Sequence, residues 1–208
     1  YNQIFTRDIA FVIDDKFIKA NILPDRDEEI EAISHVLDQI DPDKILTMPE
    51  SAHIEGEDYK SFITARTNMK GVNALQELFP DREVVSFSLK KSNTEARDNA
   101  LHLDCCFQPV GKGKAIIYKG GFLIEEEYNW LVNLFKEENL FHITRDEMFN
   151  MNSNVFSISE DVVISEMNFP RLNKWLRDQG ITVEEVPYAE ISKQEGLLRC
   201  TTLPLIRD

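Results

Sequence analysis

The stretch LHLDCCFQPVGKGKAIIY, residues 101–118, decides the fold because it pairs two apolar segments across a glycine-containing turn. The alternation on both sides of that turn predicts a hairpin of two strands. The hydrophobic period then becomes helical over Glu125–Asn139, and the short apolar segment Leu140–Thr144 predicts a third strand. This part of the chain therefore predicts a ββαβ unit.

The same order of hairpin, helix and strand occurs twice more. The predicted segments are Ile9–Ile22, Arg26–Ile40 and Lys44–Pro49 in one copy, and Asn154–Ser165, Phe169–Gly180 and Ile181–Val186 in the other. Repeated units of this kind bury their sheets against each other around a common centre. We therefore expect an α/β fold in which residues 1–208 form a single domain.

A fourth unit departs from the pattern. The stretch Ile54–Asn68 leads to a predicted helix at Met69–Phe79 and a strand at Glu83–Leu89, with room for only one strand ahead of the helix. Either this unit is degenerate, or a hairpin segment near Asp58–Tyr59 is missing from the sequence. We favour a missing segment, because the other units all place two strands before the helix.

One polar residue recurs at the start of each unit. The first strands are predicted to carry, in order, Asp8, Glu55, His102, Asn154 and Cys200. Carboxylates, a histidine and a thiol at equivalent ends of radiating strands would converge on the common axis. Together they supply what a thiol-based hydrolase needs: a nucleophile, an acid or base, and groups that hold the substrate.

Composition limits the partners and the compartment. With 23 basic and 37 acidic residues the formal charge is −14, which argues against nucleic acid and anionic membranes, since both are bound through cationic patches. The same charge permits a small cationic substrate. No stretch approaches a transmembrane span. Three cysteines, an odd number without metal-ligand spacing, predict a reducing, cytoplasmic compartment and no metal site.

Five short motifs occur in order along the chain. They are FTRD (Phe5–Asp8), IEGED (Ile54–Asp58), ARTN (Ala65–Asn68), LHLD (Leu101–Asp104) and EGLLRCTTLPL (Glu195–Leu205). Together they resemble the guanidino-modifying enzymes: arginine deiminase, dimethylarginine dimethylaminohydrolase and the amidinotransferases. The resemblance implies the pentein fold, a five-bladed α/β propeller of ββαβ modules with pseudo-five-fold symmetry. In that fold the strand with the cysteine completes a module begun at the N-terminus, and we expect that module to be incomplete here.

The resemblance also implies a role for each matching residue. Cys200 would be the nucleophile that attacks the guanidinium carbon, and His102 the general acid and base. Glu55 would complete the catalytic set by gripping the guanidinium nitrogens. The implied substrate-binding residues are Asp8 and Asp104 at the guanidinium, Arg66 and, as a weaker candidate, Arg26 at the substrate carboxylate, and Asn2 and Phe5 along the pocket. No cofactor is implied, and a homodimer is compatible with the resemblance.

The chemistry of the guanidinium group supports these roles independently. A guanidinium is delocalised and stays protonated, so water alone attacks it poorly. Its planar N–H groups match carboxylates bidentately, which fixes the central carbon for attack. A thiolate is the strongest nucleophile available near neutral pH.

Three functions remain open. The leading one is hydrolysis of arginine or an N-methylated arginine to a ureido product (citrulline), with release of ammonia or an alkylamine. An amidinotransferase would share the first covalent step and pass the amidino group to an amine. A non-catalytic pentein that binds a ligand is disfavoured, because the cysteine, the histidine and the acids all remain. The motifs do not distinguish arginine, methylarginine and agmatine as substrates.

Some neighbouring residues have simpler explanations. The acidic run Asp25–Glu31 predicts the first turns of a solvated helix. Arg199 is expected on the opposite face of a strand from Cys200, in a structural role. Relatives often carry several glycines before the cysteine where this chain has only Gly196, so we expect the loop before Cys200 to differ.

Overall fold

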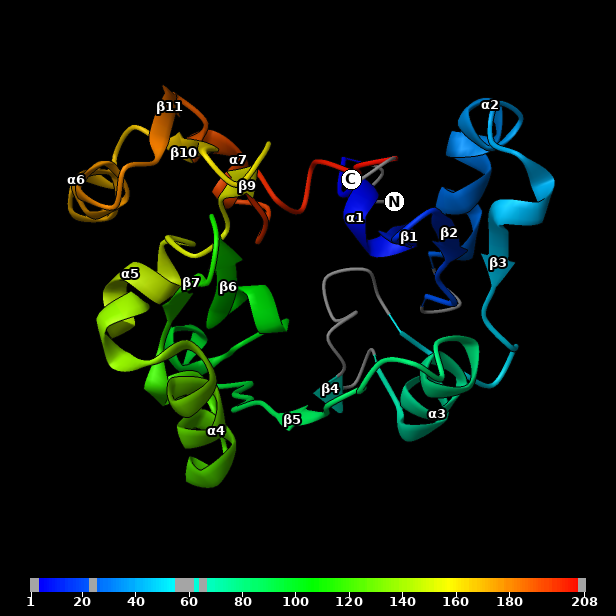
Figure 1. Ribbon diagram of the computed structural model, residues 1–208, viewed down its shortest axis with the longest axis horizontal. Coiled ribbons are helices and arrows are strands. Elements are labelled where there is room, and N and C mark those ends of the chain that lie inside the picture. Colours follow the sequence, from blue (N-terminus) through cyan, green and yellow to red (C-terminus); the bar gives the residue numbers. More distant parts are fainter. Residues whose placement is uncertain (1–3, 23–25, 55–61, 64–66, 206–208) are drawn as a thin grey trace. The chain divides into compact units, whose positions relative to one another are not determined.

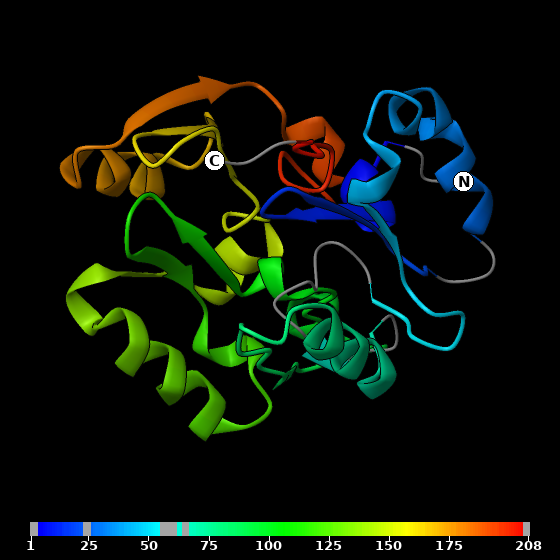
Figure 2. The ribbon, with the colours of Figure 1, turned by 45° about the vertical axis from the view of Figure 1, so that its right-hand side comes forward.

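The chain forms two compact units, each with its own hydrophobic core. The computed structural model describes residues 4–22, 26–54, 62–63 and 67–205. The first unit takes in residues 1–87 together with the C-terminal residues 200–208, and the second is Ser88–Arg199. Figure 1 labels the helices and strands, and Figure 2 shows the ribbon turned by 45°.

The first unit contains a three-stranded sheet in the order β1 (Ala10–Ile13), β2 (Lys16–Lys19) and β3 (Ile45–Thr47). β1 and β2 are antiparallel, and β3 runs parallel to β2. The hairpin turn begins at Asp14, whose φ of 53° is the left-handed conformation that a two-residue turn requires and that aspartate tolerates. The hairpin predicted around Asp14–Asp15 is therefore confirmed.

The connection from β2 to β3 differs from its prediction. A single α-helix is expected over Arg26–Ile40, but the segment forms the 3₁₀-helix η1 (Asp27–Ile33), the short α2 (Ser34–Leu37) and η2 (Pro42–Lys44). In a 3₁₀-helix, side chains three residues apart eclipse one another. Arg26 and Glu29 have this spacing and form an ion pair, which favours the tighter helix.

The second unit contains two further three-stranded sheets with the same pairing. One consists of β6 (Phe107–Val110), β7 (Lys114–Ile117) and β8 (Leu140–His142), and the other of β9 (Phe156–Ser157), β10 (Val162–Glu166) and β11 (Thr182–Val186). In each, an antiparallel hairpin is followed by a third strand parallel to the second. The crossovers contain α4 (Glu125–Phe135) and α6 (Pro170–Asp178). The three ββαβ units predicted from the sequence are confirmed.

The remaining elements of the second unit are short. They are η4 (Ala96–Asp98), η5 (Leu103–Cys105), η6 (Lys119–Gly121), η7 (Glu137–Asn139), α5 (Arg145–Phe149) and α7 (Ala189–Ser192).

Helix α6 shows how sequence sets an element here. Pro170 occupies the first helical position, and Gly180 follows the helix with a φ of 80°, the arrangement in which proline starts and glycine ends a helix. Leu172 and Leu176, one turn apart, are both fully buried in the core of the second unit. No helix among the described residues is long and apolar enough to span a membrane.

The fourth unit is present in part. α3 (Met69–Leu78) is capped by Asn68, whose side chain accepts a hydrogen bond from Gly71 N at 2.9 Å. Gly71 is required for packing, because a Cβ there would lie 2.3 Å from the carbonyl oxygen of His53. The short strands β4 (Phe62–Ile63) and β5 (Phe87–Ser88) pair. The expected missing segment at Asp58–Tyr59 lies outside the described residues.

The recurring polar residues lie beside the first strands and not on them. Asp8 belongs to the short helix α1 (Thr6–Ile9), His102 precedes η5, Asn154 precedes β9, and Cys200 lies in a turn. The prediction that strands carry these four residues is therefore wrong. The strands are filled by fully buried apolar side chains such as Phe11 in β1, Ile116 in β7 and Val163 in β10, an environment that penalises polar groups without partners.

Candidate active site

Asp8, Arg26 and Glu29 form a buried ion cluster in the first unit. Arg26 Nη1 donates to Asp8 Oδ2 at 2.7 Å, while its Nε and Nη2 donate to Glu29 Oε1 and Oε2 at 3.0 and 2.7 Å. All three residues are buried. Two predicted substrate-binding residues, Asp8 and Arg26, therefore contact each other, and Glu29 adds a bidentate carboxylate to the pair.

The cluster holds Arg26 in its charged form inside the first unit. Burial opposes the charged form of Arg26, but hydrogen bonds to Glu29 and the charge of Asp8 outweigh it and raise the pKa of the guanidinium above its usual value. Sequence reasoning missed Glu29, which was expected in a solvated helix. Its spacing from Arg26 indicates the contact, since charged side chains three residues apart lie next to each other on a helix.

Removal of Arg26 is expected to cost more stability than removal of an exposed arginine. In Arg26→Met, the buried carboxylates of Asp8 and Glu29 lose their ion pairs with Arg26, and breaking a buried pair in this way costs about 3–5 kcal/mol. Urea denaturation measures the free energy of unfolding. The matched control is Arg82→Met in the same unit, whose pair with Asp14 is more than half exposed and is worth at most about 1 kcal/mol. If both variants lost the same small amount of unfolding free energy, the buried cluster would stabilise the fold no more than an exposed ion pair does.

Cys200 lies in a turn that packs on the first unit. It is 3% exposed, and its carbonyl oxygen accepts a hydrogen bond from Arg7 N at 3.1 Å. Arg7 also donates through Nη2 to Thr202 Oγ1 at 3.4 Å, and Leu203 packs against the core of this unit. The segment with the cysteine thus returns to the N-terminal unit, as the resemblance implies, but as a turn and not as a strand.

The loop before Cys200 differs from a glycine-rich one in its backbone. Glu195 has a φ of 66°, a left-handed conformation that glycine adopts without penalty. A side chain in this region costs roughly 1–2 kcal/mol. The chain therefore keeps a left-handed position just before Gly196 without using glycine there.

A second polar cluster surrounds Asp104 in the second unit. Asn154 Nδ2 donates to Asp104 Oδ2 at 2.9 Å, and Arg199 Nε lies 3.2 Å from the same oxygen. Asn154 Oδ1 in turn accepts a hydrogen bond from Arg199 N at 3.0 Å. All three residues are buried. Arg199 therefore holds a predicted substrate-binding residue in place, which agrees with the structural role expected for it.

His102 and Asp104 belong to one short segment. His102 precedes η5 at the N-cap position, is 2% exposed, and accepts a hydrogen bond from Cys105 N through its carbonyl oxygen at 3.3 Å. Ser153 Oγ lies 2.5 and 2.8 Å from the carbonyl oxygens of Asp104 and Cys105. Ser153 and the neighbouring Asn154 thus hold both the backbone and the carboxylate of this segment.

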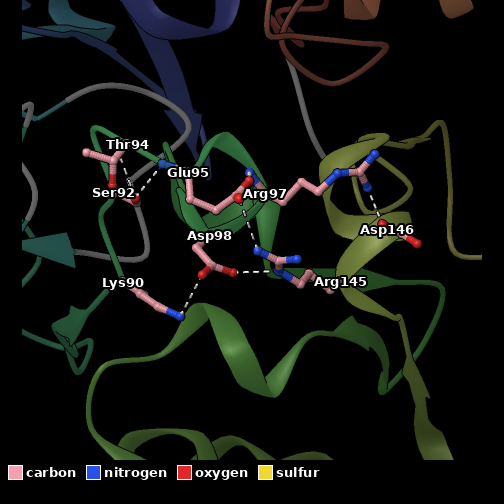
Figure 3. A network of polar contacts seen from close by, with 8 residues as sticks. All are labelled: Lys90, Ser92, Thr94, Glu95, Arg97, Asp98, Arg145 and Asp146. Carbon is pink, nitrogen blue, oxygen red and sulfur yellow. Dashed lines mark hydrogen bonds and ion pairs between the residues drawn. The ribbon is translucent and has the colours of Figure 1, made fainter.

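An exposed ionic network holds the residues ahead of this segment (Figure 3). Arg145 Nε of α5 donates to Asp98 Oδ1 at 2.7 Å, and Lys90 Nζ lies 3.3 Å from Asp98 Oδ2. The hydrogen bond from Arg145, assisted by Lys90, lowers the pKa of the Asp98 carboxyl. Arg97 of η4 pairs with Asp146, which lies next to Arg145 on α5. The network links η4 to α5, and salt is expected to weaken it because its charges are exposed.

Three predicted site residues, Glu55, Arg66 and Asn2, lie outside the described residues. Phe5 is buried in the first unit, where its carbonyl oxygen accepts a hydrogen bond from Asp8 N at 3.3 Å. Among the described residues, no three histidine, cysteine, aspartate or glutamate side chains are grouped so that they could hold a metal.

Comparison with known proteins places the chain in a family. The family model described as N,N dimethylarginine dimethylhydrolase, eukaryotic, matches residues 1–207. The uncharacterized protein YkgA of Bacillus subtilis is 31% identical over 211 residues, covering 99% of this chain and 70% of YkgA. Arginine deiminase of Latilactobacillus sakei is 26% identical over 139 residues, covering 52% of this chain and only 34% of the deiminase.

Solved structures agree with this assignment at the level of the fold. The N-terminal domain of ArgZ, a cyanobacterial arginine dihydrolase solved with its substrate, superposes with a TM-score of 0.82 at 19% identity, covering 98% of this chain and 76% of that one. Dimethylarginine dimethylaminohydrolase of Pseudomonas aeruginosa, solved with citrulline, gives 0.76 at 18% identity, with 97% and 75% covered. By the family match and the fold, this chain belongs to the N,N dimethylarginine dimethylhydrolase family, within the pentein superfamily of guanidino-modifying enzymes.

Proposed function

We propose that this protein is a cysteine-dependent amidine hydrolase that acts on the guanidinium carbon of arginine or an N-methylated arginine. Its products are a ureido compound, citrulline for these substrates, and ammonia or an alkylamine. Residues 1–208 act as one catalytic domain, built as a five-bladed propeller and working in the cytoplasm without a cofactor. The family match over residues 1–207 carries the proposal, because it spans the cysteine, the histidine and all the proposed acids.

The reaction has two halves that share one nucleophile. Cys200 Sγ bonds to the guanidinium carbon, one C–N bond breaks, and His102 gives a proton to the departing amine. A thiouronium remains on the cysteine. His102 then takes a proton from water, the oxygen attacks the same carbon, the C–S bond breaks, and the ureido product leaves with the thiolate restored.

The carboxylates hold the guanidinium for this attack. Asp8, Asp104 and Glu55 accept hydrogen bonds from its nitrogens, while Phe5 and Asn2 line the pocket. The two acids that the structure describes support this role, because Asp8 and Asp104 each bind an arginine guanidinium of the protein itself through Oδ2. An ionised carboxylate has about four acceptor sites and can accept hydrogen bonds from more than one donor.

Product analysis tests the proposal directly. The protein is incubated with arginine, monomethylarginine, dimethylarginine and agmatine, and the ureido product and released ammonia or alkylamine are measured. One equivalent of each supports hydrolysis. Amidino transfer appears instead as a new guanidino compound when glycine is added as acceptor, without ureido product. Binding without turnover of any of the four would identify a non-catalytic pentein and overturn the proposal.

Arg66→Ala is expected to separate two kinds of substrate. We assign Arg66 to the substrate carboxylate, with Arg26 as a second candidate. A hydrogen bond to a charged group is worth roughly 1.5–3 kcal/mol, so arginine should lose about 10- to 150-fold in kcat/KM. Agmatine, which has no carboxylate, should change little. Equal losses on both substrates would contradict the carboxylate contact.

A further inference from the structure

A cavity of about 370 Å³ lies within the second unit, and none of the proposed catalytic or substrate-binding residues that the structure describes lines it. Its polar wall includes Glu147, Asn152, Glu166 and Arg171, and its apolar wall includes Phe169 and Leu197. Ligand pockets in proteins begin at about 300 Å³, so the volume suits a small metabolite.

Glu166 gives the cavity a buried anion. It ends β10 and is completely buried. Oε1 accepts hydrogen bonds from Asn168 N and Nδ2 at 3.1 and 2.7 Å, and Oε2 accepts one from Tyr188 N. These donors are neutral, and no described cation forms an ion pair with Glu166. A buried charge that lacks a counter-charge favours a cationic ligand.

Asn152 adds a side-chain amide to the cavity wall. The residue is 5% exposed, and its side chain makes no hydrogen bond within the described part of the chain. Its backbone is fixed, since Asn152 N donates to Glu147 O at 2.9 Å and the preceding Met151 has a φ of 64°. Buried polar side chains normally have a partner, so an amide that lines a cavity in this state points to a ligand.

Arg171, which is paired with Glu147, and the start of α6 supply hydrogen-bond donors to the cavity wall. Arg171 Nε donates to Glu147 Oε1 at 2.8 Å and its Nη2 to His142 O at 2.7 Å. The hydrogen bond to Glu147 raises the pKa of Arg171 despite partial burial, so the guanidinium stays charged. No side chain caps α6, whose first turn at Pro170 lines the cavity, and such a turn favours anions.

We propose that this cavity binds a small α-amino acid, with its ammonium group at Glu166 and Asn152 and its carboxylate at Arg171. A simple cation would leave Arg171 without a partner in the ligand, and a simple anion would face the buried charge of Glu166. A zwitterion satisfies both Glu166 and Arg171. Phe169 and Leu197, both buried, favour an aliphatic side chain.

The cavity is connected to the segment that carries His102. Two residues beyond Asn152, Asn154 holds Asp104, and two residues beyond Leu197, Arg199 holds the same carboxylate. A ligand that contacts Asn152 and Leu197 therefore lies two residues from each of the two supports of Asp104. We infer that the amino acid is an effector of the reaction; this part rests on the proposed function.

Isothermal titration calorimetry with L-leucine tests the binding, since leucine has no guanidinium group and cannot be turned over. Two fragments serve as matched ligands: 3-methylbutylamine lacks the carboxylate, and 4-methylpentanoate lacks the ammonium. Leucine should bind at least about 10-fold more tightly than either. Glycine, L-alanine and L-ornithine complete the panel. Dissociation constants weaker than about 10 mM for all four amino acids would overturn the proposal.

Variants locate the binding. Arg171→Met should weaken leucine at least about 10-fold, whereas Arg177→Met should not; Arg177 lies on the same helix, is equally exposed and also pairs with a glutamate. Asn152→Leu keeps the volume, removes the amide, and should weaken leucine as well. Unchanged affinity in both cavity variants would place leucine elsewhere and overturn the proposal.

The rate with the best guanidino substrate tests the effector role. Leucine should change this rate in the wild-type protein but not in Asn152→Leu. The same effect in both proteins would indicate competition at the reaction site and overturn that role. If the protein turned over no guanidino substrate, the proposed function would be wrong, but calorimetry would still show whether leucine binds in the cavity.

Discussion

Cys200→Ser is expected to abolish turnover while leaving the fold intact. The hydroxyl has nearly the size of the thiol but is far less nucleophilic near neutral pH. Loss of a nucleophile in other hydrolases costs several orders of magnitude, so we expect at least a roughly 10³-fold decrease in kcat. Measured on the best substrate from the product analysis, the variant should still bind that substrate, since the carboxylates remain.

Cys105→Ala is the matched control for this change. Cys105 is also a buried cysteine, but it belongs to the hydrophobic core of the second unit. Its loss should lower stability and leave the chemistry in place. If Cys200→Ser kept more than a few per cent of the wild-type activity, or if both variants lost activity equally without unfolding, Cys200 could not be the nucleophile.

The repeated architecture could be predicted from the sequence because it is local. Alternation in Phe107–Val110 and Lys114–Ile117 and the helical period in Glu125–Phe135 are visible within a short window, and the structure has all three elements. The pairing of the strands then follows from right-handed crossovers. The same reasoning placed polar residues such as His102 and Asn154 on the first strand of each unit, which was wrong. Periodicity shows which segment is extended, but it does not show whether a polar residue next to that segment belongs to the strand.

The ion clusters could be predicted only in part. Arg26 and Glu29 are close in sequence, so their contact had a local signal. Asp104 and Arg199 are far apart in sequence, and their contact depends on how the chain returns after α7. No pattern of residue types specifies that path. The resemblance indicated Asp104 as a site residue, but only the structure supplied the residues that hold it.

For the substrate proposed above, the buried arginines beside both acids bear on how a guanidinium would be recognised. Asp8 and Asp104 already bind Arg26 and Arg199, so each carboxylate is fixed before a substrate arrives. A fixed carboxylate loses less rotamer entropy on binding than a mobile one. The arginines also reduce the net negative charge, which weakens general attraction for cations. Under the proposed function, this arrangement would favour shape and hydrogen-bond matching over charge alone.

His102→Ala is expected to slow both halves of the reaction. Without the imidazole, the departing amine leaves unprotonated and water is not activated, and a general acid–base residue contributes on the order of 10²–10⁴-fold. Steady-state kcat should fall by this amount. The carbonyl oxygen of His102 accepts the hydrogen bond from Cys105 N, and alanine keeps that contact.

Intact-mass analysis of the same variant shows which half is slower. If attack still occurs and hydrolysis of the thiouronium is the slower step, the protein mass increases by that of the substrate minus the departing ammonia or alkylamine, and the adduct disappears when Cys200 is also replaced by serine. His142→Ala is the matched control: His142 lies on β8, pairs with Glu137 at 2.8 Å and is partly exposed, so its loss should leave kcat unchanged. Wild-type kinetics in His102→Ala would mean that His102 only packs in the core of the second unit. An adduct that persists without Cys200 would assign the covalent step to a different residue.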